Sequence, residues 1–137
     1  MLNLYGYTGA FTVAAAKGGA RSTTTVDLSG VYLAWCEENL RENGLDGPSH
    51  HLVRAEAEGF LRASSPRWDV AVLDPPSFST VGADGPLDVA RDHRRLVERA
   101  LGALRAGGVL WFSTNHQRFE PALDGLAARE VREVTAE

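Results

Sequence analysis

The sequence contains a single cysteine, Cys36, among its 137 residues. One cysteine cannot close a disulfide within the chain and lacks the partner cysteines of a zinc cluster, so we expect neither a disulfide framework nor a metal site. Every uninterrupted apolar run falls short of the roughly 20 residues that cross a bilayer, and the first residues lack the charged-then-apolar order of a signal peptide. These absences favour a cytoplasmic protein with no membrane partner.

Positive charge is also scarce. The formal net charge is −4 at pH 7 and the pI is about 5.5, which is the wrong sign for a protein that grips a phosphate backbone with its whole surface. Lysine is nearly absent: Lys17 is the only one, and the other 13 of the 14 basic residues are arginine. Any contact with nucleic acid is therefore expected to be local.

The length and the 44% of hydrophobic residues suit one domain, residues 1–137, with a proper core. No internal repeat is present, and short apolar runs alternate with helical patterns. The pattern predicts strands over residues 1–4, 23–26, 51–54, 70–73, 109–112 and 131–135, helices over residues 10–17, 29–43, 56–63 and 88–105, and a long loop over residues 77–87.

Strands separated by helices imply βαβ crossovers and hence an α/β fold with a doubly wound, mainly parallel, Rossmann-like sheet. In such folds ligands bind at the carboxyl ends of the strands. The functional residues are therefore expected in the loops that follow Leu4, Val26, Arg54, Leu73 and Phe112.

The first of these loops, Gly6-Tyr7-Thr8-Gly9, has two glycines that allow close approach of the backbone to a ligand, although it lacks the three-glycine spacing of the dinucleotide fingerprint. Asp27 follows the second strand, 18 residues after Gly9, near the place where a carboxylate accepts both ribose hydroxyls. Its alternative role is the N-cap of the next helix. Glu56 follows the third strand and suits either an adenine amine or a helix start.

Two consecutive prolines follow the fourth strand in Asp74-Pro75-Pro76-Ser77-Phe78. They remove two N–H donors and leave carbonyl groups that no strand can use, an arrangement that suits a planar heterocycle. Phe78 is placed to stack on that ring, with a rigid turn and a core phenylalanine as the alternative. Beyond the fifth strand, Asn115 and Arg118 are candidates for contact with substrate.

The ordered motifs resemble the class I S-adenosylmethionine-dependent methyltransferases that modify 23S ribosomal RNA. The resemblance is greatest to the guanine-N7 methyltransferase half of the bifunctional large-subunit enzymes and runs nearly end to end. It is carried by residues 3–9 (NLYGYTG), 25–29 (TVDLS), 73–79 (LDPPSFS), 88–93 (DVARDH) and 112–115 (FSTN).

The resemblance implies that the chain binds S-adenosylmethionine and acts on 23S rRNA or its precursor. It implies that Gly6 to Gly9 wrap the methionine part of the cofactor, that Asp27 holds its ribose, and that Glu56 holds its adenine. The implied cofactor-binding residues are Tyr5, Gly6, Tyr7, Thr8, Gly9, Asp27, Leu28, Glu56 and Asp74. The implied catalytic residues are Asp74, Pro75, Pro76, Phe78, Asn115 and Arg118.

The sequence also departs from the pattern of related enzymes. Cytosine-C5 enzymes of this kind have a nucleophilic cysteine where this chain has Thr114, and Cys36 is expected to be a buried structural thiol inside the second helix. In adenine-N6 enzymes the aromatic residue directly follows the prolines, whereas Ser77 intervenes here. An RNA-binding module and a last strand of the family are missing, so we expect a truncated methyltransferase domain with one exposed sheet edge.

Guanine N7 has an in-plane lone pair, so methyl transfer to it needs no deprotonation and no covalent intermediate. Catalysis would then be mostly positioning, and His93 is expected to pack or cap rather than to act as an acid or base. The alternatives are a cytosine-C5 or adenine-N6 rRNA methyltransferase, an enzyme of the same fold with another substrate, and a non-catalytic fragment that binds cofactor.

Overall fold

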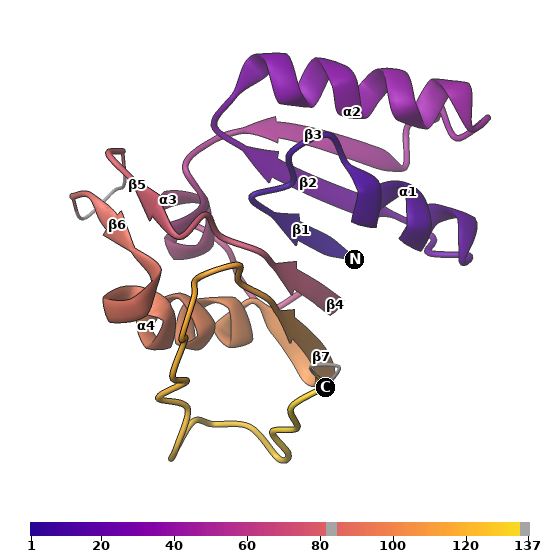
Figure 1. Cartoon of the computed structure of the whole chain (residues 1–137). Coiled ribbons are helices and arrows are strands. Elements are labelled where there is room, and N and C mark those ends of the chain that lie inside the picture. The colour runs from indigo at the N-terminus through magenta and orange to yellow at the C-terminus, as the bar shows by residue number, and fades with distance from the viewer. Residues whose placement is uncertain (82–84, 135–137) are drawn as a thin grey trace.

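A five-stranded parallel sheet in the order β3-β2-β1-β4-β7 forms the centre of the computed structural model, which describes residues 1–81 and 85–134 (Figure 1). The register of each neighbouring pair is parallel. The predicted α/β, Rossmann-like, doubly wound fold is therefore confirmed. The strands are β1 (Leu2–Leu4), β2 (Thr23–Asp27), β3 (His50–Arg54), β4 (Trp68–Leu73) and β7 (Leu104–Phe112).

Helices cover both faces of the sheet (Figure 1). The helices are α1 (Ala10–Lys17), α2 (Gly30–Glu42), α3 (Ala57–Arg62) and α4 (Val89–Gly102). α1 and α2 pack together on one face, and α3 and α4 pack together on the other. This is the arrangement that right-handed crossovers produce when the chain first moves outward from β1 to β3 and then returns to β4 and β7. No helix of the described residues is long and apolar enough to span a bilayer.

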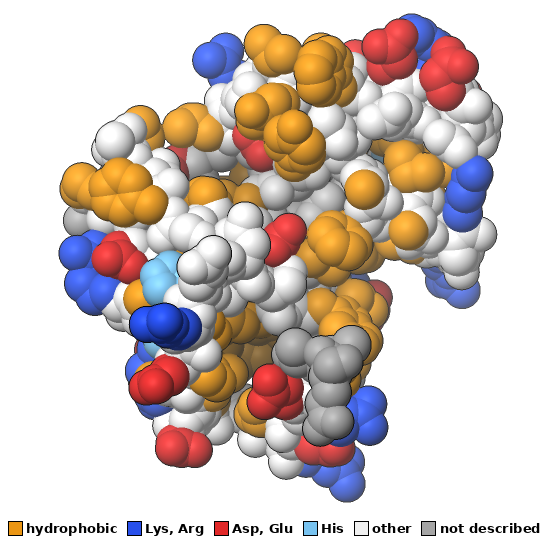
Figure 2. Space-filling model, viewed as in Figure 1, with side chains coloured by type: hydrophobic (Ala, Val, Ile, Leu, Met, Phe, Trp, Pro, Cys, Tyr) orange, Lys and Arg blue, Asp and Glu red, His pale blue; other side chains and the backbone are white. Residues whose placement is uncertain are grey.

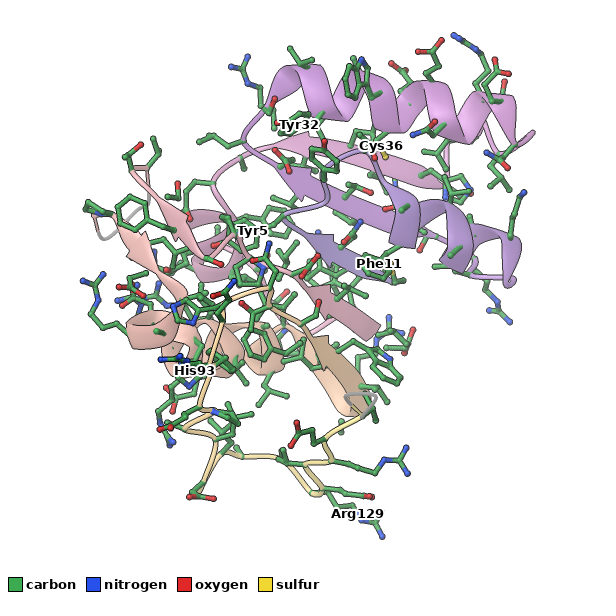
Figure 3. The ribbon with its side chains drawn as sticks, viewed as in Figure 1. Tyr5, Phe11, Tyr32, Cys36, His93 and Arg129 are labelled. Carbon is green, nitrogen blue, oxygen red and sulfur yellow. The ribbon has the colours of Figure 1, made fainter. Side chains whose placement is uncertain are left out.

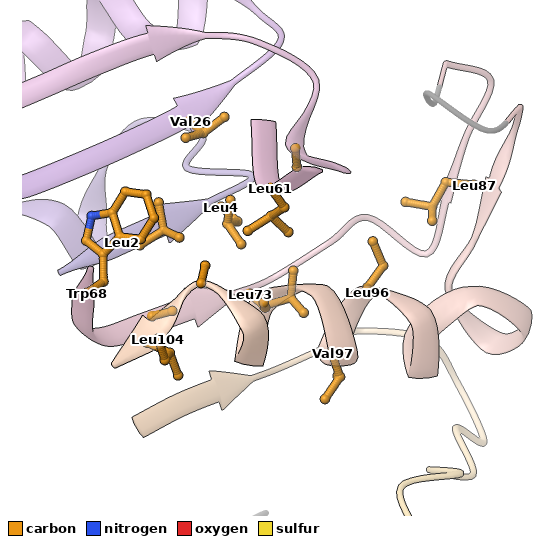
Figure 4. Close-up of a cluster of buried hydrophobic side chains, with 14 residues drawn as sticks. Leu2, Leu4, Val26, Leu61, Trp68, Leu73, Leu87, Leu96, Val97 and Leu104 are labelled. Atoms are coloured by element: carbon orange, nitrogen blue, oxygen red, sulfur yellow. The ribbon is translucent and has the colours of Figure 1, made fainter. Parts of the chain in front are cut away.

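The two faces of the sheet differ in chemistry because side chains alternate along each strand. On the α3 and α4 side, Leu2, Leu4 and Val26 enter a buried apolar cluster with residues of both helices (Figure 4). On the α1 side the sheet presents buried polar groups: the Asn3 amide donates to Thr12 Oγ1 (2.9 Å), and the Thr12 and Thr25 hydroxyls are 2.6 Å apart. The main hydrophobic stabilisation therefore lies beneath α3 and α4.

The boundary between α4 and the last strand was predicted too far along the chain. The helix ends at Gly102, and residues 104 and 105, predicted to be helical, already belong to β7. β7 starts opposite Trp68 and passes an irregularity before Val109 pairs with Val70. Gly107, with φ of 81°, lies in that irregularity. Gly107 and the next residue, Gly108, thus lie within a bulged strand and not at the end of a helix.

Two further predictions need correction. The predicted loop over residues 77–87 begins and ends in short strands, β5 (Phe78–Ser79) and β6 (Leu87–Asp88), which pair antiparallel as a hairpin. Residues 131–134 form no strand, and residue 135 of that predicted strand lies outside the described residues. The segment pairs with no strand in the described part of the chain, although β7 is an edge strand of the sheet, so the weak alternation alone did not produce a strand.

The chain after β7 runs without helix or strand from residue 113 to 134 and is held against α4 by side chains of that helix. His93 Nδ1 faces the carbonyl oxygens of Val89 and Ala90 at 3.0 Å each, and Nε2 lies 2.8 Å from the Ala122 amide nitrogen. Because two acceptors face Nδ1 and a donor faces Nε2, the imidazole fits as the neutral Nδ1–H tautomer. Arg94 adds hydrogen bonds to two carbonyl groups of the same segment. The buried His93 therefore packs in the core and links α4 to the segment after β7.

Buried carboxylates join α3 to α4. Glu58 of α3 accepts two hydrogen bonds from Arg95 of α4, at 3.0 and 3.2 Å, and also pairs with Arg99. Asp92 accepts from both the Nε and a terminal nitrogen of Arg91, at 2.9 and 2.7 Å, and from the Asp88 backbone amide. These partners compensate the burial of the carboxylates, which would otherwise be costly.

Acid is expected to weaken the fold through Asp92. Its hydrogen bonds with Arg91 lower the pKa of this carboxyl to about 2, against about 3.9 in an unfolded chain. A carboxyl whose pKa is lower in the folded protein stabilises the fold at pH values above its unfolded pKa. This stabilisation is lost as the pH falls toward the pKa of the folded state. Linkage gives about 2.6 kcal/mol at neutral pH, about half of which is lost by pH 3.

Urea unfolding at pH 5 and pH 3, compared between the wild type and Asp92→Asn, measures this contribution. The difference in unfolding free energy between the two proteins should shrink at pH 3. Asp69→Asn, which alters an exposed carboxylate paired with Arg105, is the matched control. An equal difference at both pH values would show that Asp92 titrates normally.

Candidate active site at the carboxyl edge of the sheet

The loops predicted to carry function meet at one edge of the sheet. Val26, Leu4, Leu73 and Phe112 are aligned across neighbouring strands by the parallel register. The next residue on each of these strands is therefore also aligned, and the row beyond the last aligned residues contains, in spatial order, Arg54, Asp27, Tyr5, Asp74 and Ser113. Asp27 and Asp74 are separated by two strand spacings, about 10 Å, and share one rim.

Backbone strain is concentrated in the loop between β1 and α1. Tyr5 and Tyr7 have φ values of 56° and 48°, a left-handed conformation that non-glycine residues rarely adopt. The Gly6 amide donates to the Val26 carbonyl at 3.0 Å, and the Gly9 amide donates to the Gly6 carbonyl at 2.8 Å. The loop is thus folded tightly against β2, and such strain is common where a backbone is shaped for a ligand.

The two glycines of this loop meet protein atoms rather than open space. A Cβ at Gly6 would lie 2.3 Å from Thr25 Cγ2, and a Cβ at Gly9 would lie 2.1 Å from Cys36 Sγ. Both glycines are therefore required for close packing on β2 and α2, and the predicted approach of their backbone to a ligand stays a prediction. Cys36 is fully buried, as predicted, and burial raises the pKa of its thiol (Figure 3).

Asp27 connects the first two loops of the site. Its Oδ2 accepts from the Tyr7 amide at 2.9 Å and its Oδ1 accepts from the Ser29 amide at 2.8 Å. The N-cap of α2 is Ser29, whose hydroxyl accepts from the Tyr32 amide at 3.3 Å. The carboxylate of Asp27 is thus fixed at the end of β2 without capping the helix, and each oxygen keeps lone-pair capacity for a further donor.

Glu56 stands next to Asp27, because the Ala55 amide donates to the Asp27 carbonyl at 3.1 Å. Its carboxylate caps α3 and accepts from the amides of Glu58 at 3.0 Å and Gly59 at 2.6 Å. The helix-start role considered for Glu56 is therefore present. Contact with adenine would use the lone pairs that remain.

The other predicted cofactor residues also border this part of the rim. The side chain of Tyr5 packs against the apolar core, and burial raises the pKa of its hydroxyl. Tyr7 is exposed and its ring contacts Tyr32 edge-on at 4.4 Å. The carbonyl of Thr8 accepts from Asn39 of α2, and Leu28, which follows Asp27, is exposed. Val31 and Trp35 of α2 are exposed hydrophobic residues, and Figure 2 shows hydrophobic side chains gathered on the surface over this part of the molecule.

Two hydrogen bonds connect the loop after β4 with the loop after β7. The Ser113 hydroxyl donates to Asp74 Oδ1 at 2.7 Å, and the Ser77 hydroxyl donates to Asn115 Oδ1 at 2.7 Å. Asp74 and Asn115, each predicted to be a catalytic residue, thus lie on two loops that these hydrogen bonds join. Sequence reasoning missed both serines as site residues, and the only signal was their place next to residues already chosen.

The remaining predicted residues differ in position. Of the two prolines that follow β4, Pro75 is buried and Pro76 is exposed. Phe78 is 61% exposed, which excludes the alternative of a core phenylalanine. Arg118 is exposed and has a φ of 55°, in the segment after β7 that packs on α4. Among the described residues, no side-chain hydrogen bond links Phe78 or Arg118 to the two loops that the serine hydrogen bonds join.

Comparison with known proteins shows which family the chain belongs to. The profile of the S-adenosylmethionine-dependent methyltransferases matches residues 1–135. The ribosomal RNA large subunit methyltransferase K/L of Allochromatium vinosum is 48% identical over 99% of this chain. The chain spans only 19% of the length of that relative.

Solved structures agree. SMU.776, solved in complex with SAH, superposes with a TM-score of 0.76 at 34% identity, over 84% of this chain and 30% of that one. The SAM-dependent methyltransferase from Agrobacterium tumefaciens superposes with a TM-score of 0.75 at 28% identity, over 85% of this chain and 38% of that one. Profile, sequence and fold all lead to the same conclusion: the chain belongs to the S-adenosylmethionine-dependent methyltransferases, enzymes whose cofactor is S-adenosylmethionine.

Proposed function

We propose that this chain carries the site that transfers a methyl group from S-adenosylmethionine to a base of 23S rRNA, with guanine N7 as the acceptor atom. The observation that carries the proposal is the rim itself, where Asp27 and Asp74 lie two strands apart. The name of the Allochromatium vinosum relative supports rRNA as the substrate. The order of the motifs in this sequence supports guanine N7.

The residues around Asp27 fit the cofactor. Asp27 would accept from the ribose hydroxyls, since its two oxygens each hold one backbone amide and retain lone pairs. The first helical hydrogen bond of α1 runs from Val13 to Gly9. The preceding amides at the start of α1 are therefore free of intrahelical partners and suit the carboxylate of the methionine part. Leu28 and Glu56 would border the adenine. The bound cofactor supplies an electrophilic methyl group on a sulfonium.

The residues around Asp74 would hold the base. Oδ2 of Asp74 has no hydrogen-bond partner in residues 1–81 and 85–134, so it can accept from a base N–H. The carbonyls of Pro75 and Pro76 cannot be used by a strand partner in this turn, and Phe78 is exposed for stacking. These groups orient the ring so that N7 faces the methyl group. Good alignment alone can supply several kcal/mol of the barrier, out of roughly 7–11 kcal/mol for ideal orientation.

Covalent C5 chemistry is less well supported. Thr114 occupies the position of the expected nucleophile, and the one cysteine, Cys36, is fully buried beneath Gly9 on the α2 side of the sheet. Its thiol pKa is raised by burial, which opposes formation of a thiolate. A lone pair on a ring nitrogen needs no such group.

Nucleoside mass spectrometry tests the proposal. The chain is incubated with S-adenosylmethionine and unmodified 23S rRNA, which is then digested to nucleosides. We expect 7-methylguanosine to appear. The product 5-methylcytidine or N6-methyladenosine would replace guanine N7 by another acceptor, and measurable cofactor binding with no methylated nucleoside would leave a cofactor-binding fragment.

Phe78→Ala separates the base site from the cofactor site. Because Phe78 is 61% exposed, its loss should change stability by less than about 0.5 kcal/mol and leave cofactor affinity intact. Methylation of an rRNA fragment should fall about tenfold, since stacking contributes roughly 1–3 kcal/mol per base. Activity is measured by transfer of labelled methyl groups, with the exposed Val81→Ala as control. A parallel fall in cofactor affinity would assign Phe78 to the cofactor site.

A further inference from the structure

Ser77 holds one end of the Asn115 side chain. Its hydroxyl donates to Asn115 Oδ1 at 2.7 Å, across 38 positions of sequence. The amide nitrogen of Asn115 has no hydrogen-bond partner in the described ranges 1–81 and 85–134, and the side chain is exposed at the rim. An asparagine can present either an acceptor or a donor to a ligand. Here the acceptor is engaged within the protein, so the end left for a ligand is the donor.

The second hydrogen bond between the two loops leaves an acceptor, rather than a donor, for a ligand. Ser113 donates to Asp74 Oδ1, and Oδ2 is left as an acceptor. The two hydrogen bonds make each loop hold the base-facing side chain of the other: Ser113 of the β7 loop holds Asp74, and Ser77 of the β4 loop holds Asn115. The orientation of both polar groups is therefore set before any base arrives, which reduces the entropy lost on binding.

We propose that Ser77 is a positioning residue that sets base preference, because it turns the Asn115 amide so that only N–H groups face the substrate. This inference rests on the proposed function and names what the same site selects. An N–H donor favours a base with a keto oxygen next to the acceptor atom, as O6 of guanine is next to N7. It disfavours a base with an amine there, since two donors would face each other and the N–H would stay unpaired once the base covered it.

Binding of nucleoside monophosphates measures this preference without any methyl transfer. Guanosine 5′-monophosphate is compared with the 5′-monophosphate of 2,6-diaminopurine riboside, which keeps N7 and the 2-amino group but has an amine in place of O6. Both are titrated into the chain saturated with S-adenosylhomocysteine, and affinity is read by NMR from the side-chain amide signal of Asn115. We expect guanosine monophosphate to bind about tenfold more tightly, the ratio that corresponds to about 1.4 kcal/mol.

Ser77→Ala should bring the two affinities within about twofold of each other, because the freed amide can turn either end toward the base. Ser77→Thr keeps the hydroxyl and should restore the preference. Ser79→Ala is the matched control, since Ser79 lies two residues after Ser77 and its hydroxyl bonds only to Val81 among the described residues. It should leave the tenfold ratio unchanged, and none of the variants should alter affinity for S-adenosylhomocysteine.

The inference is overturned if Ser77→Ala keeps the full preference, or if the wild type binds both nucleotides equally or prefers the diaminopurine form. The last result would mean that Oδ1 of Asn115 faces the base. Failure of the proposed function is a separate outcome: a preference for guanine that depends on Ser77, with no 7-methylguanosine formed on rRNA, retains the inference and removes N7 transfer.

Discussion

Replacing Asp27 with alanine is expected to weaken binding of S-adenosylmethionine at least tenfold, as measured by isothermal titration calorimetry. The Asp27 carboxylate is the charged acceptor proposed for the ribose hydroxyls, and it also holds the Tyr7 and Ser29 amides. Hydrogen bonds to a charged group contribute about 1.5–3 kcal/mol each. The substitution would remove both the proposed ribose contact and the anchor of the loop between β1 and α1.

Asp27→Asn separates these two contributions. An asparagine retains one carbonyl oxygen that can accept from a backbone amide but has lost the charge and one acceptor. Its affinity should fall between those of the wild type and of the alanine variant. Asp69→Ala is the control, because that exposed carboxylate lies at the opposite end of β4 and pairs with Arg105. An unchanged dissociation constant in Asp27→Ala would remove the ribose assignment.

The largest effect on stability is expected from Gly9→Ala. The new Cβ would lie 2.1 Å from Cys36 Sγ, and alanine would have to adopt a φ of 80°. A left-handed conformation costs a non-glycine residue about 1–2 kcal/mol, and overpacking costs about 1–3 kcal/mol. The unfolding free energy, measured by urea denaturation, should therefore fall by about 3 kcal/mol.

Two further variants divide this loss into its causes. Gly19→Ala has the same conformational cost at a φ of 91°, but no atom lies within 4 Å of the new Cβ, so about 1 kcal/mol should be lost there. In the double variant with Cys36→Ala, Gly9→Ala should recover about half of its loss, because the sulfur atom is gone. Additive losses in the double variant would show that Cys36 is not what excludes a side chain at Gly9.

Turn chemistry made some of the site predictable. Proline cannot continue a strand, so Asp74-Pro75-Pro76 had to mark the end of β4, and the β-branched run before Asp27 had to be a buried strand. Because consecutive parallel strands end at the same edge, their loops could be placed together without any contact being known. The rim that contains Asp27 and Asp74 follows from these local rules.

Other features depended on segments that are distant in sequence. Nothing near Ser77 in the chain indicates that it bonds to Asn115, and nothing near Gly9 indicates that Cys36 lies against it. The hairpin β5–β6 was missed for another reason: its strands have only two residues each, too few to show a period. The segment over residues 131–134 had a weak period and formed no strand.

The sequence by itself determined the order of the four helices and of the five strands of the parallel sheet, and the edge at which the polar loops meet, because periodicity and turn residues act over a few neighbouring positions. Only the tertiary structure decided which side chains pair across that edge and that Gly6 and Gly9 are packed on Thr25 and Cys36. Those contacts depend on how the strands align and how the helices pack. A shift of one residue in register would turn every side chain of a strand to the opposite face of the sheet.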